Sequence, residues 1–303
     1  MTAKYFRFLC GCFCFLYGFT CGQSFFESSI NKGWSELVKD NDSIALLYFN
    51  EAYRIAKAAQ DDGGMADASY YMGITTYSVS YSIGLRYAME SMKLYEQLNA
   101  KNPEVAVKGR AKCLQLISTI YRRQGKWKES IQLSRQAMLP LPPSKDSSGQ
   151  LGLIYFSIGS AYSNLQLTDS ADYYFQLSLA ERSWKKDSVY LPLSLLKVAE
   201  IERRKGDRNK SLELSNRALT MAEVTGNRQA VVSSLIDLGQ WHEVFATDKK
   251  VSESFYRKAL QVSSQLSDKS YYMSSLQALA NFNLKNNRMM DAYNYQVRMA
   301  DLK

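Results

Sequence analysis

The chain has 303 residues, of which 46% are hydrophobic and 22% charged, and its formal net charge is +9 at pH 7. It contains a single His and five Cys, which leaves too few good ligands for an ordinary zinc site. No glycine-rich phosphate loop and no paired-carboxylate pattern stands out, so we predict no enzyme, no catalytic residue, no metal site and no cofactor.

Residues 1–22 differ from the rest of the chain. Lys4 and Arg7 precede the apolar run Phe8–Phe19, which is followed by Thr20-Cys21-Gly22. A charged start, a short apolar run and small residues at its end are typical of a secretory signal peptide, and the run is too short to span a bilayer. We therefore expect an exported protein in the periplasm or cell envelope of a bacterium. Without Lys4 and Arg7 the chain keeps 38 − 2 = 36 basic and 29 acidic residues, a net charge of +7.

Cys21 leaves a second interpretation of this segment open. It resembles, loosely, the Cys of a bacterial lipoprotein signal, which becomes the lipidated N-terminus after cleavage. The alternative is ordinary cleavage near Gly22 and Gln23. In either case Cys113 is the single cysteine left in the body of the chain, so no internal disulfide is predicted.

A pair of small residues recurs seven times through the rest of the chain. Five pairs are separated by 12 residues and the other two by 11 and 13, and their first members recur at intervals of 40, 45, 41, 40, 40 and 41. The pairs are Gly33/Ala45, Gly73/Gly84, Ser118/Ser130, Gly159/Ala171, Ala199/Ser211, Gly239/Ser252 and Ala280/Ala292. A fixed period of this length indicates a stacked array of one structural unit, and small residues allow two helices to cross closely.

The apolar residues around each pair have helical spacing. In the fourth unit one stripe includes Ile154, Ile158 and Tyr162, and a second stripe begins at Ala171 after a short turn with capping residues. We predict seven helix pairs over residues 25–62, 65–100, 103–140, 150–184, 189–225, 229–267 and 270–303. The Pro/Ser-rich stretch Leu139–Gln150 is either a hinge or a long surface loop.

This pattern resembles the tetratricopeptide repeat family. Small and aromatic residues match the family pattern at Gly159, Tyr162, Ala171, Phe175 and Ser178 in the fourth unit. The resemblance implies an all-α fold, an α-solenoid superhelix of about seven helix pairs covering residues 23–303. The usual family period is 34, so the helices here should be longer by about a turn. Similar long repeats occur in the sensory segments of bacterial regulators.

Two arginine pairs occupy equivalent positions and are the main binding candidates. Arg122 and Arg123 follow Ser118 as Arg203 and Arg204 follow Ala199, and the resemblance implies that these positions face the concave side. Guanidinium groups along one groove would suit carboxylates or phosphates. The alternative is that these are solvated cations at helix ends. The full predicted groove set comprises Tyr70, Tyr77, Lys112, Gln115, Arg122, Arg123, Asn164, Arg203 and Arg204.

The partner predicted from this set is a protein or peptide of acidic character. Residues 101–145 hold ten basic and two acidic residues. Nucleic acid is not predicted, and contact with a membrane is expected only through a lipid on Cys21. The family variant that clamps C-terminal carboxylates uses Lys and Asn positions that this chain lacks, so that ligand is not implied.

Two further features bear on function. His242 falls where the family places a packing aromatic residue, so we interpret it as a core residue rather than a catalytic one. Met289, Met290 and Tyr293 in the last predicted helix have no following helix to cover them, so this end would pack on a partner or on a second copy. We therefore favour an exported peptide-binding scaffold, and the alternative is the periplasmic sensory segment of a transcriptional regulator or histidine kinase.

Overall fold

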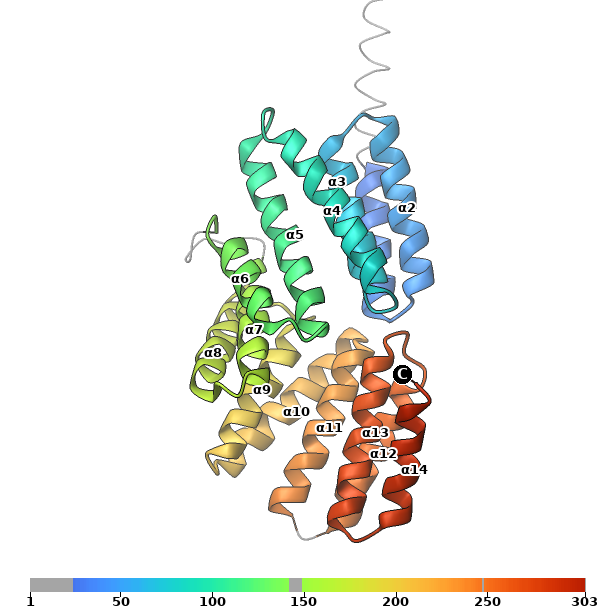
Figure 1. Ribbon diagram of the computed structural model, residues 1–303, viewed down its shortest axis with the longest axis vertical. Coiled ribbons are helices and arrows are strands. Elements are labelled where there is room, and N and C mark those ends of the chain that lie inside the picture. The colour runs from blue at the N-terminus through green and yellow to red at the C-terminus, as the bar shows by residue number, and fades with distance from the viewer. Residues whose placement is uncertain (1–23, 142–148, 247, 303) are drawn as a thin grey trace, which may run out of the picture. The chain divides into compact units, whose positions relative to one another are not determined.

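A computed structural model of the chain describes residues 24–141, 149–246 and 248–302. Every regular element within these ranges is an α-helix, which confirms the predicted all-α fold (Figure 1). Residues 24–38 are helical, and the following helices are α2 (Asp42–Ala58), α3 (Asp62–Thr76), α4 (Tyr81–Leu98), α5 (Pro103–Arg123), α6 (Trp127–Met138), α7 (Gln150–Asn164), α8 (Thr168–Lys185), α9 (Leu191–Arg204), α10 (Arg208–Thr225), α11 (Arg228–Phe245), α12 (Lys249–Ser263), α13 (Lys269–Lys285) and α14 (Met289–Ala300).

The predicted signal peptide, with Cys21, lies outside the described residues, as does most of the loop predicted as a hinge. Among the described helices, none is both long and apolar enough to cross a bilayer.

The chain divides into two compact units. The first includes residues 24–37 and Asn41–Leu116, and the second includes Val38–Asp40 and Ile117–Lys303. Helix α5 contributes its first part to the first unit and its last two turns to the second.

The first unit is built from helix pairs that cross at small residues. A Cβ atom placed on Gly33 would lie 2.5 Å from the ring of Phe49 in α2, and one on Gly84 would lie 2.5 Å from the Cβ of Tyr77. The ring of Phe49 stacks on Tyr71 of α3, with ring centres 5.2 Å apart. The absence of a side chain on Gly33 makes room for the Phe49 ring, and the absence of one on Gly84 lets the Tyr77 backbone approach closely.

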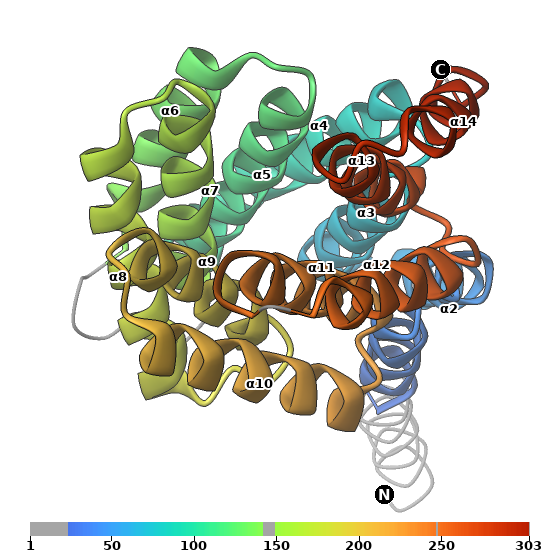
Figure 2. The same ribbon diagram turned by 90° about the horizontal axis from the view of Figure 1, so that it is seen from below.

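The second unit repeats this arrangement with successive helix pairs. Helices α7 and α8, α9 and α10, α11 and α12, and α13 and α14 form the pairs, and α13 and α14 run side by side in Figure 2. The crossing residues are those of the predicted register: Gly159 meets the Phe175 ring, and Gly239 meets the Tyr256 ring.

The first helices of these pairs also contact one another. Helix α11 contacts α9 on one side and α13 on the other, so the three form one layer of the second unit. Since α9, α11 and α13 come from consecutive repeats, side chains at equivalent positions form rows across this layer. This layer positions the candidate site.

Candidate binding site

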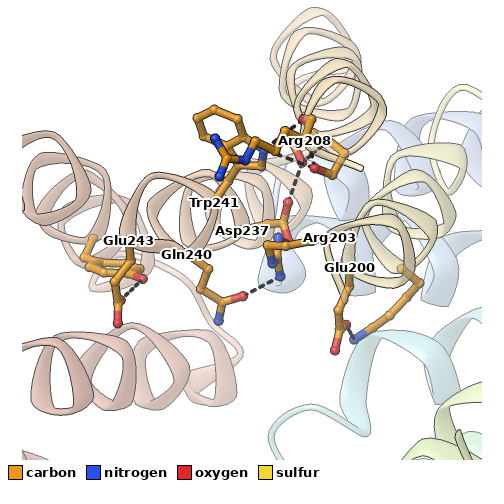
Figure 3. Close-up of polar contacts among 11 residues, drawn as sticks. Glu200, Arg203, Arg208, Asp237, Gln240, Trp241 and Glu243 are labelled. Carbon is orange, nitrogen blue, oxygen red and sulfur yellow. Dashed lines mark hydrogen bonds and ion pairs between the residues drawn. The ribbon is translucent and has the colours of Figure 1, made fainter. Parts of the chain in front are cut away.

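A row of polar side chains crosses the layer formed by α9, α11 and α13. Glu200, Gln240 and Asn281 each directly follow the small crossing residue of their helix, so they occupy equivalent positions in consecutive repeats. Polar residues one turn before or after them extend the row. We call this set the polar band: Glu200, Arg203, Asp237, Gln240, Glu243, Gln277, Asn281 and Lys285 (Figure 3 shows its α9 and α11 part).

An ion pair lies at the centre of the polar band. Arg203 Nη1 of α9 donates to Asp237 Oδ1 of α11 at 2.7 Å, and their side chains are 9% and 10% exposed. The second oxygen of Asp237 accepts a hydrogen bond from the hydroxyl of Ser215 in α10. Both charges are therefore compensated inside the fold, as a buried ion pair requires.

Arg203 also fixes an exposed amide. Its Nη2 atom donates to Oε1 of Gln240 at 2.9 Å, and Gln240 itself is exposed to solvent. Arg203 thus reaches from α9 to two residues that lie one turn apart on α11 (Figure 3).

Glu243 links α11 to both α12 and α13. Its Oε2 accepts from the Tyr256 hydroxyl at 2.8 Å, and its Oε1 accepts from Lys285 Nζ at 2.6 Å. Burial, and then the hydrogen bond to Glu243, raise the pKa of Tyr256. The Glu243 side chain is 18% exposed and that of Lys285 is 70% exposed, so the cation of this pair is the part that faces solvent.

Glu200 supplies a negative charge at the α9 side of the band. Burial alone would raise its pKa, but Lys197, together with Arg203 and Arg204, outweighs burial and holds the pKa below its ordinary value. Lys197 Nζ donates to Glu200 Oε2 at 3.0 Å. Glu200 is therefore ionised at neutral pH.

Two exposed amides complete the band on α13. Gln277 Nε2 donates to Asn281 Oδ1 at 2.8 Å. The polar band therefore offers amide groups and charges whose orientations are set by internal partners. Such groups can bind a ligand through hydrogen bonds and through complementary charge. In the described part of the chain, no group of three or more His, Cys, Asp or Glu side chains is placed to hold a metal ion.

Of the four arginines predicted to line a groove, Arg203 is the one that lies in the polar band. Arg204 instead pairs with Asp172 of α8 at 2.7 Å, and Arg123 pairs with Asp268 at 2.7 Å. Arg122, in the last turn of α5, is partly buried. The alignment of two arginine pairs along one groove stays a prediction, and in the second unit Arg123, Arg203 and Arg204 each pair with a carboxylate from elsewhere in the fold.

The predicted site residues of the first unit mostly face its interior. Tyr70 and Gln115 are 7% and 8% exposed, and the Tyr77 side chain packs at the α3–α4 crossing against Gly84. The Tyr70 ring and the Gln115 amide therefore belong to the interior of this unit, and Tyr77 is partly buried.

Lys112 in α5 is half-buried and pairs with Asp67. Its Nζ donates to Asp67 Oδ1 at 3.2 Å, and the same oxygen accepts from the Tyr95 hydroxyl at 2.7 Å. Burial would lower the pKa of Lys112, but Asp67 and Tyr71 outweigh it and raise the pKa above its ordinary value.

Asn164 ends α7, where it is exposed and its Nδ2 donates to the Ser160 carbonyl at 2.8 Å. His242 is half-buried, with its ring stacked on Phe255 at 5.3 Å, and burial lowers its pKa. These contacts agree with the interpretation of His242 as a packing residue.

The reasoning from sequence missed Glu200, Asp237, Gln240, Glu243 and Asn281. A usable signal was present, because polar residues follow the crossing residue in three consecutive first helices. Asp237 carries a second signal, since it lies between Leu235 and Leu238 in an apolar stripe, where a carboxylate needs a partner.

Comparison with known proteins identifies the fold but not a family. No protein-family model and no curated protein matches the chain. Among solved structures, the Rap conjugation gene regulator of the plasmid pLS20 in complex with the Phr* peptide matches with a TM-score of 0.70 and 11% identity, over 91% of this chain and 75% of that one.

Two further neighbours are similar. A Rap protein complexed with competence and sporulation factor matches with a TM-score of 0.69 and 13% identity, over 91% of this chain and 74% of that one. The apo form of the quorum sensor NprR from B. thuringiensis matches with a TM-score of 0.64 and 14% identity, over 90% of this chain and 75% of that one. At these identities the likeness establishes the fold, a helical repeat of the tetratricopeptide type.

The neighbours contradict the location expected from the sequence. Proteins that match nine-tenths of the chain are a conjugation gene regulator and a quorum sensor, so the expected location in the periplasm or cell envelope is wrong. That expectation relied on the N-terminal run alone. A pair of cations before a short apolar run is not specific to export signals, because other segments have the same pattern.

Proposed function

We propose that the protein binds a peptide, or an extended segment of another protein, along the polar band of α9, α11 and α13. The observation that carries this proposal is the row formed by Glu200, Gln240 and Asn281. These residues occupy one position in the first helices of three consecutive repeats, and α11 contacts both α9 and α13. Such a row matches a ligand that repeats along its own length, as a polypeptide main chain does. The complex of a structural neighbour with the Phr* peptide supports a peptide as the class of ligand.

The proposal keeps the expectation of an acidic ligand, but Lys285 and Arg204 now support it in place of the two predicted arginine pairs. In two ion pairs beside the band, Lys285–Glu243 and Arg204–Asp172, the carboxylate is the less exposed partner. The Glu243 side chain is 18% exposed and that of Asp172 is 23% exposed. The side chains of their cationic partners, Lys285 and Arg204, are 70% and 46% exposed. At these two pairs an acidic ligand therefore meets positive groups first, whereas Glu200, with its side chain 41% exposed, presents a negative charge at the α9 side.

A regulatory role for such binding is a second candidate. The structural neighbours are named as a gene regulator and a quorum sensor, and this chain covers about three-quarters of their length. In this candidate the same peptide site serves as the sensory segment of a regulator.

Selection from a random peptide library displayed on phage tests the proposed function. We expect selected peptides to bind the protein and to lose more than about tenfold in affinity when Asn281→Trp fills the band with a bulky side chain. The matched control is Asn294→Trp on the exposed surface of α14, which should bind as the original protein does. Failure to select any peptide, or an equal loss in both variants, would contradict the proposal.

A further inference from the structure

The contact between Arg203 and Gln240 determines which end of an amide faces a ligand. A guanidinium group has hydrogen-bond donors and no acceptor, whereas a Gln carboxamide has an acceptor oxygen and an NH2 group with two donors. The atom of Gln240 that lies 2.9 Å from Arg203 Nη2 must therefore be its oxygen. This assignment follows from the chemistry of the two groups.

With its oxygen held by Arg203, Gln240 directs its Nε2 atom and the two N–H donors on it away from the guanidinium. Arg203 cannot rotate freely, because its Nη1 atom is anchored on Asp237, which is itself held by Ser215. The exposed Gln240 amide is thus pre-oriented, and a ligand need not supply the free energy for ordering it.

The equivalent position of the next repeat presents the same group. Asn281 accepts from Gln277 through its Oδ1 atom, which leaves the Nδ2 donors for other partners. Packed helices are about 8–10 Å apart. Carbonyl groups on one edge of an extended chain recur every second residue, about 6.8 Å apart. Two donor amides on adjacent helices can therefore reach two main-chain carbonyls of one peptide.

We propose that the polar band reads main-chain carbonyl oxygens of an extended peptide through Gln240 and Asn281, and that Arg203 is a positioning residue that sets Gln240 as a donor. This inference rests on the proposed function. It adds which atoms of the ligand are recognised, and it predicts binding that tolerates different peptide sequences, since every peptide carries the same carbonyl groups.

The test uses a peptide obtained by phage selection and the variant Gln240→Glu. A carboxylate keeps the shape of the side chain and strengthens the contact with Arg203, so the melting temperature should be unchanged or higher. It replaces the outward N–H donors by an oxygen that repels carbonyl groups, so affinity for the peptide should fall by more than about tenfold.

Gln265→Glu is the matched control. Gln265 Oε1 accepts from Arg228 Nη2 at 2.7 Å, so it has the same arginine–amide contact outside the band. We expect no change in affinity for this variant. Retained affinity in Gln240→Glu would overturn the inference, whereas failure to select any peptide would instead contradict the proposed function.

Two further measurements separate positioning from a merely structural role. Arg203→Lys keeps a cation for Asp237 but lacks the rigid two-nitrogen fork that fixes Asp237 and Gln240 together, so affinity should fall while the melting temperature changes little. Replacing single peptide bonds of the ligand by esters weakens the carbonyl acceptor, and one such peptide should bind the original protein less tightly. That sensitivity should disappear in Gln240→Glu. Affinity of Arg203→Lys equal to that of the original protein would show that Arg203 does not position the amide.

Discussion

Arg123 in the last turn of α5 donates to Asp268 at 2.7 Å, and Asp268 at the same time caps α13 by accepting from the Ser270 amide at 3.0 Å. The two side chains are 18% and 4% exposed. Each charge also lies where the helix dipole favours it, with the cation at a C-terminus and the anion at an N-terminus. This pair therefore stabilises the second unit by joining helices of non-consecutive repeats.

Removing the cation of this pair should destabilise the protein strongly. Arg123→Met leaves Asp268 buried without its partner, which we expect to cost about 3–5 kcal/mol of unfolding free energy. Urea unfolding followed by circular dichroism measures this. The control is Lys101→Met, because Lys101 is 72% exposed in its pair with Asp62 and such surface pairs contribute about 0–1 kcal/mol. Equal losses in the two variants would show that the Arg123 pair is a surface contact.

The crossing glycines should not tolerate even a methyl group. A Cβ atom on Gly239 would lie 2.4 Å from Tyr256 Cε1, and Tyr256 is fully buried, so Gly239→Ala should cost about 1–3 kcal/mol. Gly63→Ala is the control, because the nearest atom there lies 3.3 Å away and Ala is the better helix former. We expect Gly63→Ala to be neutral or stabilising by up to about 1 kcal/mol. The urea midpoint should therefore fall in Gly239→Ala and stay the same or rise in Gly63→Ala, and an equal fall in both variants would contradict the register.

Acid should weaken the contact between α12 and α14. Burial raises the pKa of Glu253, but hydrogen bonds from Arg288 and Arg257 outweigh burial and lower the pKa below its ordinary value of 4.5. A depressed pKa in the folded protein means that the stabilisation is present above pH 4.5 and is lost as the pH falls through the folded value. Urea midpoints measured from pH 7 to pH 3 should fall less steeply in Glu253→Gln. Identical slopes would show that Glu253 does not contribute to this pH dependence.

Cys113 should be inert towards alkylating reagents in the folded protein. Burial raises the pKa of its thiol to about 12, although a hydrogen bond with Ser91 opposes this. The nucleophilic thiolate is therefore almost absent at pH 8. Peptide mapping by mass spectrometry after iodoacetamide treatment should find Cys113 unmodified until urea unfolds the protein. Rapid modification under native conditions would indicate that the first unit opens readily.

The fold was predictable because its determinants are local and repeat. Small residues at a fixed period identify the helix crossings, and Gly159 with Phe175 illustrates how one glycine and one aromatic ring define each crossing. Serines at equivalent positions behave in the same way, since Ser118 and Ser130 are buried and hydrogen-bonded to each other. The division of the chain into two compact units has no comparable local signal.

The candidate site was harder to predict because its partners come from different repeats. Nothing near Arg203 in the sequence identifies Asp237 as its carboxylate, or Asp172 as that of Arg204. An arginine that is paired internally has the same sequence pattern as one that faces a ligand. The fold of neighbouring repeats decides between the two roles, and for this reason our proposal assigns recognition to the amides of Gln240 and Asn281 rather than to the arginines.

Photo-crosslinking tests the location of the peptide site most directly. A peptide selected from the random library is made with a benzophenone amino acid near its centre, irradiated in complex with the protein and mapped by mass spectrometry. The account predicts crosslinks to residues of α9, α11 and α13, and their loss in the Asn281→Trp variant. Crosslinks confined to helices of the first unit, or crosslinks unchanged in Asn281→Trp, would contradict it.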